Sequence, residues 1–273
     1  MKLFSILILC LFTFSCSKIN ISLALAPRYI SNKIDDAFDF KSEKVSRLRT
    51  QIEIDLLNSK KELAKRLLEH LDQTEATFFT NEPTVESLTM LLNQFSATQT
   101  FLLQSFKPTA DLTLKDISDK EADDFKKFTD GKFLEEIEIS KDKKSFLKKR
   151  KSGFLNTFEF FLDDLTDAQE NTITEFADKN LNYFADRILV RQEYSLLFYN
   201  KLKSKEPVLE YFLNNYEGKK FEAYPNDQKK YFVRLFEFEV LFWKTVSEPQ
   251  KKYFKKVLQN YREELVKIAN SQL

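Results

Sequence analysis

Apolar residues recur at steps of three and four positions along most of the chain, which is the pattern of amphipathic α-helices. The clearest stripe lies near the C-terminus and consists of Phe254, Leu258, Tyr261, Leu265 and Ile268. Lys, Gln and Glu occupy the opposite face, so this stripe is expected to face a core. No convincing alternation of polar and apolar residues predicts a strand. We therefore expect an all-α protein, built as a single antiparallel bundle or array of helices.

Helix starts are marked by capping boxes, in which a hydroxyl side chain and a Glu or Gln three residues later satisfy each other's backbone N–H groups. These pairs are Ser118 with Glu121, Thr166 with Gln169, and Ser247 with Gln250. Thr84 and Asn226 are expected to be simpler N-caps, and Gly131 and Gly218 suit helix ends. The signals predict about nine or ten helices, over roughly residues 21–37, 41–79, 84–105, 118–130, 142–163, 166–203, 206–217, 226–246 and 249–271, with 131–141 ambiguous.

A second apolar stripe predicts another amphipathic helix and consists of Leu147, Phe154, Phe158, Phe161 and Leu165. The segment 231–243 is apolar nearly all round, so we expect it to be the central, most buried helix. Glu237 and Glu239 lie within it and are expected to be partly buried. Arg234 stands three residues from Glu237 and is placed to pair with it.

The first sixteen residues, MKLFSILILCLFTFSC, form a short apolar leader that ends at Cys16. The apolar stretch is shorter than the about 20 residues that span a bilayer and has the size of a secretory leader. The arrangement resembles a bacterial lipoprotein signal, although Thr13 and Phe14 depart from its usual residues. An ordinary signal peptide or a buried N-terminal helix is the alternative. We expect residues 1–15 to be removed, 16–20 to form the lipidated cysteine and a tether, and 21–273 to form a single all-helical domain.

A lipidated Cys16 would hold the mature protein on a membrane without crossing it, because two or three acyl chains anchor firmly. Ser17 follows the cysteine where an aspartate would favour inner-membrane retention. We therefore expect an outer-membrane address, facing the periplasm or the cell surface. Cleavage also removes Cys10, so the mature chain could form no internal disulfide.

The composition excludes several function classes. The chain has 43 basic and 42 acidic residues, and such a balance argues against a nucleic-acid partner. Only 3 glycines are present, which leaves little material for phosphate-cradling loops. His70 is the only histidine, and it lies between Leu67 and Leu71, where a boundary position explains it. We expect no metal site, no cofactor and no catalytic residue.

A run of basic residues is the strongest candidate binding feature: Lys141, Lys143, Lys144, Lys148, Lys149, Arg150 and Lys151. Positive charge at a helix start opposes the helix dipole, so helix propensity does not explain the run. An anion, a lipid head group or an acidic envelope protein would explain it. The rival explanation is internal compensation by the acid-rich segment 111–138.

A second candidate is a polar network formed by Asp35, Asp36, Asp39, Arg187 and Arg191. Carboxylates close together can act as acid and base or bind a cation, whereas a capping or other structural role is the alternative. The two arginines are four residues apart on one helix face. They predict either an anion site or ion pairs with Glu193 or the aspartates.

Four stretches carry a resemblance to a known family: 34–40 (IDDAFDF), 117–121 (ISDKE), the lysine-rich run 141–151 and 165–169 (LTDAQ). In this order they resemble a family of predicted bacterial lipoproteins catalogued as domain of unknown function number 6279, over roughly residues 20–205. The chain has Lys where members have Arg, and Phe or Tyr at several Trp positions. The resemblance implies an all-helical envelope lipoprotein and transfers no activity.

Three functions remain open from the sequence. The first is a non-enzymatic, membrane-anchored envelope lipoprotein that binds a partner or supports the envelope. The second is a carrier of an apolar ligand, which the 28 phenylalanines suggest and which requires a Phe-lined cavity. The third is a hydrolase that uses the Asp35, Asp36 and Asp39 group, which requires two of these carboxylates to converge in a cleft.

Overall fold

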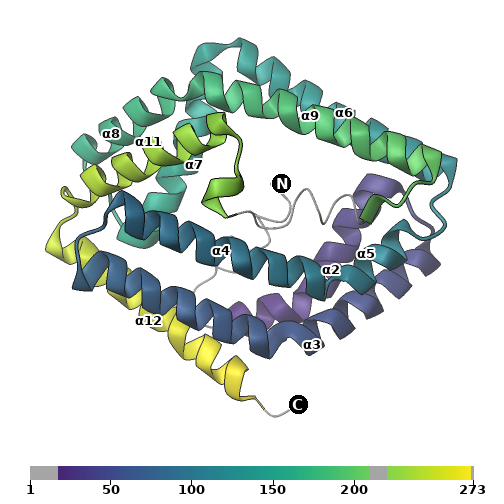
Figure 1. Ribbon diagram of the computed structural model, residues 1–273, viewed down its shortest axis with the longest axis horizontal. Coiled ribbons are helices and arrows are strands. Elements are labelled where there is room, and N and C mark those ends of the chain that lie inside the picture. The colour runs from purple at the N-terminus through teal and green to yellow at the C-terminus, as the bar shows by residue number, and fades with distance from the viewer. Residues whose placement is uncertain (1–17, 210–219, 272–273) are drawn as a thin grey trace.

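The expected all-α architecture is confirmed in the computed structural model, which describes residues 18–209 and 220–271 (Figure 1). These residues form ten α-helices and no strand: α2 (Lys18–Phe38), α3 (Ser42–Glu75), α4 (Val85–Ser105), α5 (Lys107–Leu114), α6 (Asp119–Lys141), α7 (Lys143–Leu162), α8 (Asp167–Lys179), α9 (Leu181–Ser204), α11 (Asn226–Trp243) and α12 (Glu248–Asn270). A π-helical turn, Ala76–Thr80, extends α3, and a 3-10 turn spans Phe221–Ala223. None of the helices described has both the length and the apolar character needed to cross a bilayer.

Five helices close a circuit. α3 packs against α12, α12 against α7, α7 against α6, α6 against α2, and α2 returns to α3. The remaining helices pack onto this circuit, with α4 and α5 on α3, α8 on α7, α9 on α6, and α11 on α4 and α8. Figure 1 shows the result as a frame, with α6 and α9 along its upper edge and α3 and α12 along its lower edge.

The main core lies along the contact between α3 and α12. The C-terminal apolar stripe predicted from the sequence is buried here, and α3 contributes Ile52, Leu63, Leu67 and Leu71. Each such side chain stabilises the fold by about 1.5–3 kcal/mol through its burial. The expectation that 231–243 is the central helix is therefore wrong. α11 flanks the core with Phe236, Phe238 and Phe242, but its Leu241 is 63% exposed.

Two smaller apolar clusters lie at the ends of α6. Near its start, Phe38 stacks on Phe125 at 5.0 Å between ring centroids, and Leu202 of α9 joins them. Near its end, Phe146 of α7 packs with Leu181 and Ile188 of α9. Both ends of α6 are thereby fixed, one to α2 and the other to α7.

Two corners of the circuit lie diagonally opposite each other. At one corner the first turns of α2 meet the last turn of α12, where Leu23 and Ile268 line the same hollow. The other corner is the junction of α6 and α7. The two are separated by the length of α2 and then of α6, whose 23 residues span about 35 Å.

The predicted capping boxes are present at Ser118, Thr166 and Ser247, and a further one forms at Thr84 with Ser87. Two of them are joined through their glutamines. The Gln169 amide donates to Gln250 at 3.1 Å, and the Gln250 amide donates back at 3.0 Å. Both side chains are buried, and each amide also donates to a backbone carbonyl, Gln169 to Thr245 at 3.2 Å and Gln250 to Asp164 at 2.8 Å. This reciprocal pair fixes the start of α8 to the start of α12.

Several helix boundaries differ from expectation. Gly131 does not end a helix, because it lies in α6, which continues through the ambiguous segment 131–141. Its neighbours Phe133 and Ile137 pack into the cluster around Phe146, and this packing outweighs the cost of about 1 kcal/mol for an internal glycine. Asn226 is the first residue of α11, not its cap, since Pro225 holds that position.

The helix expected over 166–203 is divided at Asn180 into α8 and α9. The Asn180 side chain donates to the Phe176 carbonyl at 2.9 Å and accepts from Arg234 Nε at 3.0 Å. These bonds replace helical ones at the break. The short helix α5 was not predicted, and the helix expected over 206–217, with Gly218, lies largely outside the described residues.

Replacing Gln169 by Leu removes the bonds between the two buried amides and half of the Thr166 capping box, while Gln250 keeps its bond to the Asp164 carbonyl. We expect the free energy of unfolding to fall by about 2 kcal/mol, measured by urea denaturation. Gln250→Leu should cost a similar amount. The Gln169→Leu/Gln250→Leu double variant should lose less than the sum, because either single variant already removes the bonds that join the two amides. Strictly additive losses would contradict the coupling.

Candidate functional site

The first half of α7 carries three exposed lysines that form no close ion pair with the described residues, although the charges of Lys144 and Asp142 interact. Lys144, Lys148 and Lys149 are exposed, and no carboxylate oxygen of the described residues lies within 4 Å of their ammonium groups. Lys144 and Lys148 are four residues apart and share one helix face, which continues to the exposed Ser152. We call these three lysines the basic face of α7.

The other lysines of the predicted run are paired. Lys143 binds Asp178 at 2.9 Å and Lys151 lies 3.6 Å from Glu170, so two partners belong to α8. Lys141 pairs with Glu138 on its own helix. Internal compensation is therefore real: α8 supplies Asp178 and Glu170, and the acid-rich segment 111–138 supplies Glu138.

Asp142 explains how α7 tolerates lysines at its start. Its carboxylate accepts a hydrogen bond from the Ser145 backbone N–H at 2.6 Å and caps the helix. This bond lowers the pKa of Asp142, so the group stays ionised and opposes the unfavourable effect of the lysines on the helix dipole.

Arg150 does not belong to the exposed basic face. Its guanidinium lies over the rings of Phe146 and Phe184, at 4.7 and 5.4 Å, and burial lowers its pKa. Arg191 approaches the same region and forms an ion pair with Glu136 of α6. Arg150 thus packs at the junction of α6, α7 and α9, where it covers aromatic surface.

The five residues of the predicted polar network do not come together. Asp36 pairs with Lys33 at 2.9 Å, and Asp39, whose backbone is left-handed, pairs with Lys120 at 2.8 Å. The Asp35 carboxylate accepts from the Phe40 backbone N–H at 3.0 Å and so ends α2.

The partners expected for the arginines are also wrong. Arg191 binds Glu136 and not Glu193 or an aspartate, and its Nε donates to the carbonyl of Arg187. Asp36 and Asp39 border the same hollow of about 500 Å³, but each is paired with its own lysine, and Asp35 instead accepts from the backbone at the end of α2. Among the described residues no group of three His, Cys, Asp or Glu side chains could hold a metal ion.

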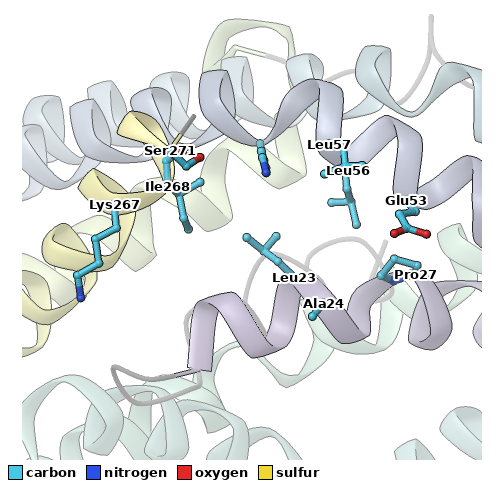
Figure 2. Close-up of a pocket in the computed structure, with 10 residues that line it drawn as sticks. Leu23, Ala24, Pro27, Glu53, Leu56, Leu57, Lys267, Ile268 and Ser271 are labelled. Carbon is cyan, nitrogen blue, oxygen red and sulfur yellow. Dashed lines mark hydrogen bonds between the residues drawn. The ribbon is translucent and has the colours of Figure 1, made fainter. Parts of the chain in front are cut away.

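A hollow of about 390 Å³ opens between α2, α3 and α12 (Figure 2). Its apolar wall is formed by Leu23, Ala24 and Pro27 of α2, Leu56 and Leu57 of α3, and Ile268 of α12. Pro27 lies inside α2 and has no N–H to give to the Leu23 carbonyl, which leaves a weakened helix along this wall. The sequence analysis missed this hollow, because its three walls are far apart along the chain.

The phenylalanines fill space and do not enclose this hollow. Phe158 packs on Phe242 at 4.5 Å, and Phe176 stacks on Phe238 at 4.4 Å. A second hollow reaches aromatic rings at Phe78 and Trp243, but its rim is polar and carries Glu82, Glu248, Lys244, Lys251, Lys252 and Lys255. Neither hollow matches the continuous Phe-lined cavity that the carrier hypothesis requires.

Comparison with known proteins adds no identification, since no family model, curated protein or solved structure matches the chain. The resemblance to the lipoprotein family stays a prediction. The geometry of the molecule is therefore the basis for assigning a function.

One partly buried acid stands apart from these features. Glu239 lies on the face of α11 that carries Leu235 and Phe242, and burial raises its pKa to about 7. Arg234, expected to pair with Glu237, instead donates to Asn180, and Glu237 is exposed. Glu239 thus destabilises the fold when it is ionised, because the folded state removes its charge from water.

The contribution of Glu239 to the stability of the protein should therefore fall as pH rises. The unfolded chain ionises Glu239 near pH 4.5 and the folded chain only near pH 7, so a contribution present below pH 4.5 is lost as pH rises through 7. Glu239→Gln should remove this loss and stabilise the protein at pH 8 by about 2 kcal/mol. Urea denaturation across pH measures the difference. Glu237→Gln is the matched control, and equal curves for the two variants would contradict the assignment.

Proposed function

We propose that this protein is a non-enzymatic lipoprotein of the bacterial envelope, held on the outer membrane by Cys16, which presents the basic face of α7 to an acidic partner. Cys16 lies outside the described residues. It precedes the start of α2 by two residues, which reach at most about 7 Å. An anchor at Cys16 would hold the first turns of α2 close to the membrane surface.

The position of the basic face relative to this anchor supports the choice of partner. The face begins at the α6–α7 junction, which is diagonally opposite the corner where α2 starts. Along the circuit, α2 and α6 separate these lysines from the anchored corner, and α6 alone spans about 35 Å. An acidic protein or polymer elsewhere in the envelope is the partner that fits.

The single observation that carries the proposal is that Lys144, Lys148 and Lys149 are exposed and have no carboxylate of the described residues within 4 Å. Their neighbours Lys143 and Lys151 do find carboxylates, so acids are within reach of this helix. Three like charges on one helix repel each other and weaken the helix slightly. An external acidic surface would attract all three lysines and so offset their mutual repulsion.

The hydrolase alternative is less favoured. Asp36 and Asp39 do line one hollow of about 500 Å³, but each pairs with a lysine, and Asp35 caps the end of α2. No catalytic residue, metal or cofactor is proposed.

The anchor is tested by globomycin, which blocks cleavage of lipoprotein signals. Treated cells should accumulate the uncleaved precursor, and the untreated protein should fractionate with the outer membrane. Cys16→Ala should abolish acyl labelling and release any processed protein from the membrane. Unchanged size and solubility in all of these samples would contradict lipidation.

The partner is tested by a photo-crosslinking residue at Ser152, beside the basic face, in the full protein in its own envelope. We expect one discrete product, and Lys144→Gln/Lys148→Gln/Lys149→Gln should reduce it about tenfold, because three exposed ion pairs are lost. High salt should reduce it as well.

A matched control removes the same charge elsewhere. Lys65, Lys252 and Lys256 are exposed on α3 and α12, and their triple Gln variant should leave the crosslink unchanged. An equal reduction in both triple variants would contradict a specific role for α7.

A further inference from the structure

We infer that the hollow between α2, α3 and α12 binds one acyl chain of an anionic phospholipid drawn from the anchoring membrane. The inference rests on the proposed anchor at Cys16, because that anchor brings the hollow to the lipid surface. The hollow itself is a property of the folded helices and can be probed separately.

The location of the hollow is the first argument. Leu23 and Ala24 lie within the first two turns of α2, so they are only a few residues from Cys16 along the chain. Ser271, just after the end of α12, lies at the same corner (Figure 2). The membrane lipids around an acylated Cys16 would therefore lie next to the opening of the hollow.

The chemistry of the walls is the second argument. Side chains from three helices present apolar surface to the hollow, and Leu57 remains 47% exposed. Such exposed apolar surface costs free energy in water, and a chain of CH₂ groups would cover it. A volume of about 390 Å³ falls within the usual range for a small-ligand site.

The charges of the rim are the third argument. Lys60 of α3 and Lys267 of α12 both border the hollow. Lys267 also forms an ion pair with Glu264 at 2.8 Å. Lys60 has no carboxylate within 4 Å among the described residues. Glu53 lies two helical turns before Lys60, at the Pro27 end of the hollow (Figure 2). A lipid phosphate is therefore expected at the Lys60 and Lys267 end, with its acyl chain directed toward Leu56 and Pro27.

The experiment uses the full lipidated protein in vesicles of phosphatidylethanolamine and phosphatidylglycerol, in which the phosphatidylglycerol carries a diazirine in one acyl chain. After illumination, mass spectrometry should find the label in peptides that contain residues 23–27, 56–60 and 267–271. Ala24→Trp fills the hollow and should remove most of this label. Leu25→Trp adds the same ring at a neighbouring position that is 58% exposed and outside the lining, and should leave the label unchanged.

Lys60→Gln tests the head group without filling the hollow, and should lower the label about fivefold because one lysine near an anionic surface is lost. It also decides the matter if Ala24→Trp fails to fold, which circular dichroism will show. Replacing the labelled lipid by phosphatidylcholine with the same diazirine should lower the label in the wild-type protein to a similar degree.

Flotation of the vesicles separates the two proposals. Protein that floats but carries no label in the three peptides overturns the lipid site and leaves the anchor intact. An acyl chain of Cys16 that itself fills the hollow would also give floating, unlabelled protein. Protein that does not float overturns the anchor and, with it, this inference. Label that persists in Ala24→Trp also overturns it, since the lipid then binds elsewhere.

Discussion

The packing of α3 against α12 is the constraint on which the rest of the molecule depends. These helices lie near opposite ends of the described chain, and their shared apolar contact closes the circuit of five helices. Because α2 also packs on α3, the closure brings the start of α2 to the end of α12. The hollow at that corner exists because three separate helices meet there without enough side-chain volume to fill it. The same closure holds the α6–α7 junction at the far side of the frame.

Local signals made much of this fold predictable. The capping boxes at Ser118, Thr166 and Ser247 each join a hydroxyl to a Glu or Gln only three positions later, so they could be recognised from the sequence. The apolar stripe of α12 could be recognised for the same reason. The break at Asn180 could not, since it depends on Arg234 from a distant helix. Gly131 was expected to end a helix, but its packing neighbours, and not its own conformational freedom, decide whether α6 continues.

The candidate sites show the same division between local and distant information. The sequence identified a lysine-rich run, but only the fold separates its paired members from the three that remain free, since Asp178 and Glu170 come from α8. It also grouped Asp35, Asp36 and Asp39 by proximity, although each meets a different partner. The hollow under α2 had no signal at all, because no single segment contains its walls. The anchor at Cys16, read from the leader alone, joins these features into one proposal: a membrane-proximal apolar corner and a membrane-distal basic one.

The central claim is that the apolar corner with the hollow lies close to the membrane, whereas the basic corner at the α6–α7 junction lies far from it. Lipidated protein with a single dye at Leu25→Cys or at Ser152→Cys can be placed on vesicles that contain acceptor-labelled lipid, since removal of Cys10 and acylation of Cys16 would leave no other free thiol. Energy transfer to the lipid should be strong from position 25 and weak from position 152. Equal transfer from both positions, or stronger transfer from position 152, would contradict the account.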